Sequence, residues 1–227
     1  GPQATLYGTG ALAGAVKLSS NDVGSDAPDY VEARVGNKDS YRIEGATGND
    51  IGGDWGYRVA LVHNSSDGFV ENAFLGRSDT NNIDETALRF AVEGHVDERT
   101  TLALTYRWYD IDNGYDAFSL DNDNRTLSDE PGFDEHQTHA VSARSTTETA
   151  AGDLILIATY ASHNIAYGYD EDWTFTGFHP WGYTSFDAYY RDVDTQTGEI
   201  RFVSNESAAL FDGITDWTIG VFYKNTE

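Results

Sequence analysis

The chain has 227 residues and neither Cys nor Met, which excludes a disulfide framework, a thiolate nucleophile and Cys-ligated zinc. Its 38 acidic residues against 14 basic ones give a formal net charge of −24, which argues against a nucleic-acid-binding surface because such a surface needs a basic stripe. The mean hydropathy of −0.50 excludes a helical membrane protein, but a protein that crosses a membrane with strands also has a polar average.

The chain opens with GPQATLYGTGALAGAVKL, a stretch in which glycines are interspersed with small residues. Glycine permits positive φ and close backbone approach, so this stretch fits a tight turn followed by a small-residue strand packed closely against its surroundings. Because Met is absent even at position 1, we expect the sequence to be a fragment or a processed product.

From about Tyr30 onward, apolar and polar residues alternate with a period of two, which predicts β-strands. The clearest segments in chain order are 31–35, 41–45, 55–61, 88–93, 101–108, 136–146, 154–162, 197–204 and 217–223. This count predicts roughly nine strands, and no segment has a convincing helical period.

The connections between these strands differ in length. Short ones are expected near 36–40, 96–99, 147–152 and 205–213, and long ones near 65–82, 110–134 and 163–192. Short turns at one end and long loops at the other are typical of an outer-membrane β-barrel.

A soluble β-sandwich also shows alternation, and it is the main alternative. Two features favour the barrel. The cleaner strands have about 9 to 11 residues, which suits a tilted membrane crossing, and the less apolar face carries charges that a wet lumen accepts. Six aromatic residues lie near the ends of the apolar faces, where their rings would reach the headgroup level: Trp55, Tyr57, Tyr106, Trp108, Trp217 and Tyr223.

The opening stretch resembles the end of the plug domain in TonB-dependent outer-membrane receptors, where a "GP…..YG…..GG.(I/V)" pattern precedes the first barrel strand. The residues that match are Gly1, Pro2, Tyr7, Gly8 and Gly14, together with Val16. Ala13 and Lys17 depart from the glycine and asparagine that are more usual there. A second stretch, 183–204, is similar to a segment of the same family in which an aromatic, acidic loop leads into a "T.E.R..S" strand.

This resemblance implies an all-β fold: an antiparallel transmembrane β-barrel, of which roughly nine of 22 expected strands are present. Residues 1–20 would be the C-terminal end of the plug and residues 21–227 the N-terminal portion of the barrel. It also implies TonB-dependent uptake of a scarce solute across the bacterial outer membrane, most often a ferric siderophore, otherwise cobalamin or a saccharide. The implied partners are the TonB complex, outer-membrane lipid and the solute, without a cofactor. A passive porin and a secreted β-sandwich that binds carbohydrate or calcium stay open as alternatives.

No catalytic motif is present: the sequence lacks HExxH, GxSxG and a P-loop, so we expect no enzyme. The acidic loop predicted over 110–134 offers hard oxygen ligands of the kind calcium prefers, although its spacing is not that of an EF-hand. These metal candidates are Asp110, Asp112, Asp116, Asp121 and Asp123. A solvated acidic loop is the alternative interpretation.

The long loop predicted over 163–192 is rich in aromatic residues, which either pack against each other or bind a ligand. The residues that we expect to contact a ligand are Trp173, Phe178, His179, Trp181 and Tyr183. A self-packed lid is the competing interpretation. Four arginines on the predicted lumen face are candidates for ion pairs with the plug: Arg42, Arg58, Arg89 and Arg107.

Overall fold

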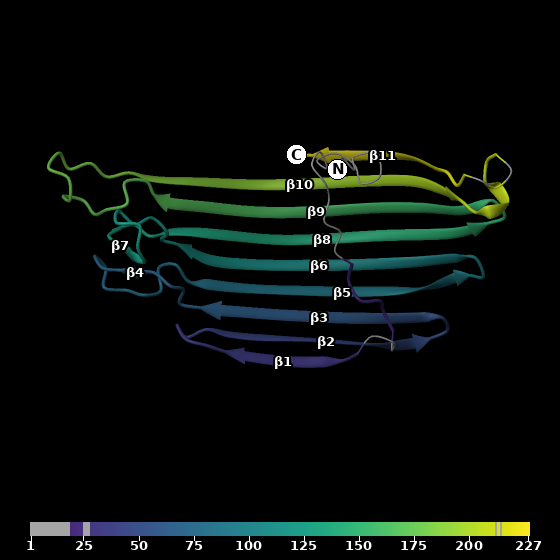
Figure 1. Cartoon of the computed structure of the whole chain (residues 1–227), viewed down its shortest axis with the longest axis horizontal. Helices are drawn as coiled ribbons and strands as arrows, with labels where there is room; N and C mark the ends of the chain where they lie inside the picture. Colours follow the sequence, from purple (N-terminus) through teal and green to yellow (C-terminus); the bar gives the residue numbers. More distant parts are fainter. Residues whose placement is uncertain (1–18, 25–27, 212, 214) are drawn as a thin grey trace.

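The computed structural model describes residues 19–24, 28–211, 213 and 215–227. Nine strands form one antiparallel sheet in which each strand pairs with the next one along the chain (Figure 1). They are β1 (Tyr30–Val35), β2 (Tyr41–Gly52), β3 (Trp55–Ser66), β5 (Ile83–Asp97), β6 (Thr100–Tyr115), β8 (Gly132–Thr149), β9 (Gly152–Asp170), β10 (Phe186–Ser204) and β11 (Thr218–Thr226). The predicted all-β antiparallel fold and its roughly nine strands are therefore confirmed.

Two short strands, β4 (Glu71–Asn72) and β7 (Arg125–Thr126), pair in parallel outside the main sheet, and one 3₁₀ turn covers Glu206–Ala208. Within the described ranges, no helix is long and apolar enough to cross a membrane. The plug-like residues Gly1, Pro2, Tyr7, Gly8 and Gly14 lie outside the described residues, so the boundary near residue 20 stays a prediction.

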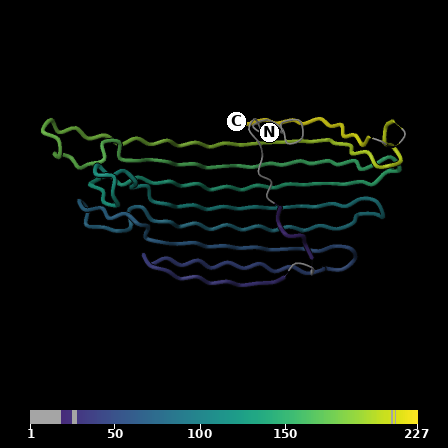
Figure 2. Tube along the Cα trace, viewed as in Figure 1, coloured from purple at the N-terminus to yellow at the C-terminus, as the bar shows by residue number. Residues whose placement is uncertain are grey.

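Several strands are longer than the sequence predicted: β8 has 18 residues, and β9 and β10 have 19 each. The trace in Figure 2 shows β8, β9 and β10 running side by side far into one end of the sheet. The predicted loops are correspondingly too wide, since Asp110 and Asp112 belong to β6, and Tyr167 and Tyr169 to β9. Backbone pairing continues there although the outward residues have become polar, so the hydropathy pattern ends before the strand does.

One predicted turn lies at the wrong end of the sheet. The connection 36–40 between β1 and β2 stands beside the long loops, because the amide of Asp67 donates to the carbonyl of Lys38 at 2.9 Å. The true turn after β2 is 53–54, which the sequence analysis did not identify. We call the end with 36–40, 67–82, 116–131 and 171–185 the loop end, and the opposite one the turn end.

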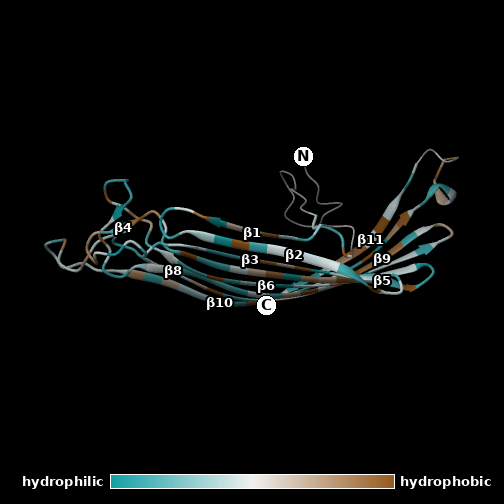
Figure 3. Ribbon diagram, turned by 90° about the horizontal axis from the view of Figure 1, so that it is seen from below, coloured by the Kyte–Doolittle hydropathy of each residue, from teal (hydrophilic) through white to brown (hydrophobic). Residues whose placement is uncertain are grey.

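The outer face of the sheet is apolar and uncovered. Each of the nine strands contributes at least one large, exposed apolar side chain to it: Val31, Ile43, Leu61, Phe90, Leu104, Val141, Leu156, Ile200 and Val221. Among the described residues, only Ala46, Ala91 and Ile155 form a buried apolar core. Figure 3 shows one curved layer. In a water-soluble β-sandwich a second sheet would pack on this apolar face, and the described residues form no such second sheet, so the face stays exposed.

The inner face is the opposite one, and Gly24 and Pro28, which precede β1, lie against it. The amide of Gly24 donates to the carbonyl of Tyr57 at 3.2 Å, and Arg58 donates to the carbonyl of Pro28 at 3.0 Å. A Cβ added to Gly56 would stand only 2.8 Å from the Cα of Gly24, so glycine is required for this close crossing. These contacts fall on the polar face, so the described residues that make them leave the apolar face free.

Candidate ligand-binding loops and inner wall

Three long loops, 67–82, 116–131 and 171–185, gather at the loop end, where Figure 1 shows them beyond the ends of the strands. The first two are joined by the β4–β7 pair, in which Glu71 and Asn72 stand opposite Arg125 and Thr126. The amide of Ala73 extends this pairing by donating to the carbonyl of Thr126 at 2.9 Å. The two loops are therefore one hydrogen-bonded unit.

A buried polar cluster holds this unit together. The side chain of Asn72, which has no exposed surface, donates from Nδ2 to Asp116 at 2.8 Å and to the carbonyl of Ser128 at 2.9 Å. The hydroxyl of Thr126 donates to the same carboxylate at 2.7 Å. The Oδ1 of Asn72 accepts from the amide of Leu75 at 2.8 Å, so both ends of its amide group are used. Satisfied buried networks of this kind fix one loop geometry.

The third loop is attached through Asp129, whose carboxylate accepts from the amide of Thr176 at 2.8 Å. Its own base is organised by Asp170 and Asp172. The first accepts from the amides of Asp172 and Trp173, and the second accepts from the amide and hydroxyl of Thr174. These carboxylates shape the backbone of the loop, which accounts for part of the acidic composition at this end.

Asp170 is also electrostatically unusual. Burial raises the pKa of its carboxyl, and the nearby charge of Asp172 acts in the same direction. Its Oδ2 and the hydroxyl of Ser128 are buried without completing a hydrogen bond of standard geometry, although Ser128 lies close enough to favour the ionised form. This corner of the loop unit therefore binds a proton more readily than an exposed Asp does.

Aromatic rings pack across the loops. Phe74 of the first loop stacks on Phe175 of the third, with centroids 4.5 Å apart and planes inclined by 7°. Phe118 of the second loop stacks on Trp173 of the third at 5.1 Å. These aromatic contacts thus connect the third loop to both of the others.

The five predicted ligand residues divide into two groups. Trp173 belongs to the self-packed group, because its ring covers Phe118 and its backbone has φ of 63°. Phe178, His179 and Trp181 form a row of ring contacts in which the rings of His179 and Trp181 lie parallel at 5.3 Å; Phe178 and Trp181 are exposed, and His179 is half-buried. Trp181 is 75% exposed, and Tyr183 is exposed nearby in the sequence. Trp181 therefore offers the largest free aromatic surface of the five, whereas Trp173 and Phe178 are exposed to nearly the same, smaller extent.

The five predicted metal ligands do not converge. Asp116 is buried and engaged with Asn72 and Thr126, and Asp123 bonds the hydroxyl of Ser119 at 2.7 Å in an exposed turn. Asp110 and Asp112 point outward from β6, and Asp121 is exposed. In the described part of the chain, no group of three or more His, Asp or Glu side chains is placed to hold a metal ion.

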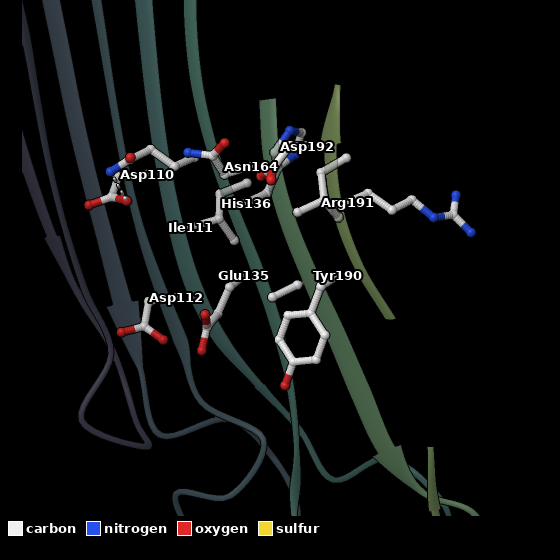
Figure 4. A pocket seen from close by; sticks show the side chains of 12 residues that line it. Asp110, Ile111, Asp112, Glu135, His136, Asn164, Tyr190, Arg191 and Asp192 are labelled. Carbon is white, nitrogen blue, oxygen red and sulfur yellow. Dashed lines mark hydrogen bonds between the residues drawn. The ribbon is translucent and has the colours of Figure 1, made fainter. Parts of the chain in front are cut away.

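An acidic groove of about 540 Å³ runs across the outer face near the loop end, and sequence reasoning missed it. Figure 4 shows Asp112 of β6, Glu135 of β8 and Tyr190 of β10 in one row across the sheet, while Arg191 extends away from the groove. The other outward side chains that line it include Asp110, Asn164 and Asp192. It lies beyond the apolar part of the outer face, which places a polar, hydrated zone above the predicted membrane region.

The inner wall carries the predicted arginines. Arg89 and Arg107 stand directly opposite each other on β5 and β6, and neither forms an ion pair with a carboxylate of the described residues. Arg42 differs because it pairs with Glu44 at 2.5 Å. Two positive charges on a concave wall attract an acidic segment or an anionic solute.

Comparisons with known proteins agree with this architecture. No protein-family model and no curated sequence matches the chain. Among solved structures, the whole chain matches the ferric yersiniabactin uptake receptor FyuA from Yersinia pestis with a TM-score of 0.78 and 19% identity. The ferric-catecholate import receptor Fiu from E. coli K12 matches 99% of the chain with a TM-score of 0.69 and 15% identity. The chain spans 35% of the length of each of them, and the likeness confirms the predicted barrel fold.

Proposed function

We propose that this chain forms part of the barrel of a TonB-dependent outer-membrane receptor that takes up a ferric siderophore. The observation that carries the proposal is the match of the whole chain to a ferric-chelate uptake receptor at a TM-score of 0.78. This match concerns the fold alone. Further support comes from the side chains on the outer face, in the loops and on the inner wall.

The outer face supports a place in the outer membrane. Its apolar side chains are exposed on all nine strands, and lipid would remove them from water. Polar pairs follow toward the loop end: the hydroxyl of Tyr106 lies 2.8 Å from Nδ1 of His139, and that of Tyr160 donates to Asp194 at 3.0 Å. Tyrosines with an apolar ring and a hydrogen-bonded tip suit the headgroup level.

The loop unit supports capture of a solute. Its first two loops are fixed by the buried network around Asn72, and the third is attached to them through Asp129, so the aromatic row of the third loop is presented by a pre-organised base. A rigid base lowers the entropy lost when a solute binds. We propose that this row makes the first contact with the chelate.

The inner wall supports a filled lumen. Arg89 and Arg107 are like charges placed directly opposite, an arrangement that destabilises a sheet unless anions approach it. We propose that acidic side chains of the plug pair with them, and that the TonB complex rearranges the plug to release the solute inward. Residues 1–20 would supply the C-terminal end of that plug.

Uptake of radiolabelled ferric siderophores tests this function. A Gram-negative strain that lacks its own siderophore receptors would express the natural full-length gene, with and without a functional TonB protein. We expect accumulation of at least one ferric siderophore only when TonB is present. Accumulation that is independent of TonB would replace this proposal by a passive porin, and a protein recovered in soluble form outside the membrane would reject both.

A further inference from the structure

Two histidines converge on one threonine at the inner wall. The hydroxyl of Thr138 lies 2.9 Å from Nε2 of His136 and 2.9 Å from Nδ1 of His163. The two nitrogens lie 3.3 Å from each other, and the ring centroids are 5.5 Å apart. Three polar atoms from two strands therefore form a small triangle.

The strand register creates this triangle. His136 and Thr138 are two residues apart on β8, so their side chains share a face, and His163 on β9 stands directly opposite Thr138. The shared face is the inner one, since Thr138 continues the row that contains Tyr109 of β6 while His139, next to it, points outward to Tyr106. Thr138 is buried, which holds the two imidazoles in place.

The triangle has the dimensions of one face of a metal coordination sphere. A tetrahedral ion with metal–nitrogen bonds of about 2.0–2.1 Å places two nitrogen ligands about 3.3 Å apart. Imidazole nitrogens suit divalent copper, nickel and zinc, whereas ferric ion as a hard acid prefers oxygen. Asp134, two residues before His136 on the same face, adds a negative charge close by.

We propose that His136 and His163 form an open site for a divalent copper, nickel or zinc ion on the inner wall. The two imidazole nitrogens are the protein ligands, and Thr138 is a positioning residue that keeps them directed at one point. Two protein ligands leave the remaining positions to water or to a chelator that already carries the ion. The site is thus suited to transient contact with a passing metal complex, and it does not depend on the ferric substrate proposed above.

The sequence contains six histidines, so the test needs a matched control. His139 serves this purpose, because it lies on the same strand one residue after Thr138 but on the outer face, where it bonds Tyr106. The full-length natural protein in detergent would be titrated with Cu²⁺ and Zn²⁺ by calorimetry. Electron paramagnetic resonance of the Cu²⁺ form would count the coordinating nitrogens.

We expect one Cu²⁺ site with two nitrogen ligands. His136→Gln and His163→Gln should each weaken it at least tenfold and remove one nitrogen coupling, whereas His139→Gln should change the affinity less than twofold. Thr138→Val should weaken the site while both nitrogen couplings remain. Glutamine is chosen to replace each histidine because its side chain can still form hydrogen bonds. A heat-modifiable band on a gel verifies that each variant is folded.

Two probes distinguish the sources of the metal. Aquated Cu²⁺ tests for a free ion, and the copper complex of nitrilotriacetate tests for an incompletely coordinated chelate. Nitrogen couplings that depend on His136 and His163 with either probe support the site and identify which form it accepts. If neither probe yields couplings that these two substitutions remove, the metal site is rejected, whatever siderophore uptake shows.

Discussion

Arg89 on β5 and Arg107 on β6 stand directly opposite each other in the antiparallel register, with both guanidinium groups on the inner face. The Nε of Arg89 is buried and has no hydrogen-bond partner in the described part of the chain. Like charges in this position destabilise a bare sheet. We therefore expect Arg107→Gln to lower the thermal midpoint of the full-length receptor, because it removes a partner from the acidic segment that we propose fills the lumen.

Arg34→Gln is the control for this experiment, since Arg34 is 61% exposed at the inner face of β1 and already pairs with Glu32. Its midpoint should stay close to that of the natural protein. A rise in the midpoint of Arg107→Gln would mean that repulsion between the two arginines is not compensated, and it would argue against an acidic partner there.

Val141 and Ser142 are neighbours on β8 that face opposite sides of the sheet, so they test which face meets lipid. Val141 is 50% exposed on the outer face, in the apolar region. We expect Val141→Arg to lower the free energy of folding into vesicles by about 1–2 kcal/mol and Ser142→Arg to cost far less. The register partners Tyr106 and Tyr160 place Val141 between the bilayer midplane, where an arginine costs about 2–4 kcal/mol, and the headgroup level, where it costs about 0–1 kcal/mol. Urea titrations of the refolded full-length protein measure both. Equal costs for the two arginines would contradict the assignment of the faces.

Period-two alternation was sufficient to predict the central part of the sheet. Leu88, Phe90 and Val92 share the outer face with Leu102 and Leu104, as their spacing in the sequence indicates. This succeeds because a side chain of a strand in a single-layer sheet has only two directions available, and the lipid and lumen of the proposed receptor would select opposite polarities.

The loop end could not be predicted in the same way. Tyr167 and Asp170 continue β9 although the pattern there no longer alternates cleanly, because backbone pairing rather than side-chain polarity sustains the strand. Asn72 and Thr126 are distant in the sequence and lie side by side in a two-residue parallel pairing, which no local sequence pattern indicates. The His136–His163 contact also depends on register, which sequence periodicity alone leaves undetermined.

Asn72 is the residue on which the first two loops depend most, since its amide group reaches Asp116, Ser128 and Leu75. Asn72→Ala leaves a buried carboxylate with one partner fewer, which should cost about 1–3 kcal/mol within the loop unit. Hydrogen exchange should accelerate across 67–82 and 116–131 and remain unchanged in β5 and β6. Asn124→Ala, at an exposed position of the second loop, is the control. Unchanged exchange in both loops would show that the β4–β7 pairing suffices without Asn72.

Asp170 predicts a pH dependence of the loop unit. Burial raises its pKa in the folded state, so its protonated form is favoured there. The loops are therefore most stable at pH values below the ordinary pKa of an aspartate. They lose this stabilisation as the pH rises through the raised pKa of Asp170 in the folded state. Hydrogen exchange of 171–185, corrected for intrinsic rates, should therefore show greater protection at pH 4 than at pH 7.

Asp170→Asn should remove this dependence. The Oδ1 of asparagine can still accept from the amides of Asp172 and Trp173, and its Nδ2 can donate to the buried hydroxyl of Ser128. We expect the variant to be better protected than the natural protein at pH 7. Poorer protection of the variant at pH 7 would mean that the ionised carboxylate is needed.

Trp181 and Phe211 are both 75% exposed, at opposite ends of the sheet, and this pair tests the proposed ligand row. Trp181 stacks on His179 at the loop end, while Phe211 lies in the connection between β10 and β11 at the turn end.

A bound chelate would cover the free face of Trp181, so Trp181→Ala should weaken binding of the transported siderophore about tenfold, corresponding to about 1.4 kcal/mol. Phe211→Ala should leave this affinity unchanged, because in the proposed receptor the membrane would separate Phe211 from the external solute. Fluorescence quenching on the purified full-length receptor measures both affinities, and Trp173→Ala separates loss of the self-packed ring from loss of the exposed one. If Trp173→Ala weakens binding and Trp181→Ala does not, the stacked pair Phe118–Trp173 is the contact surface instead of the exposed row.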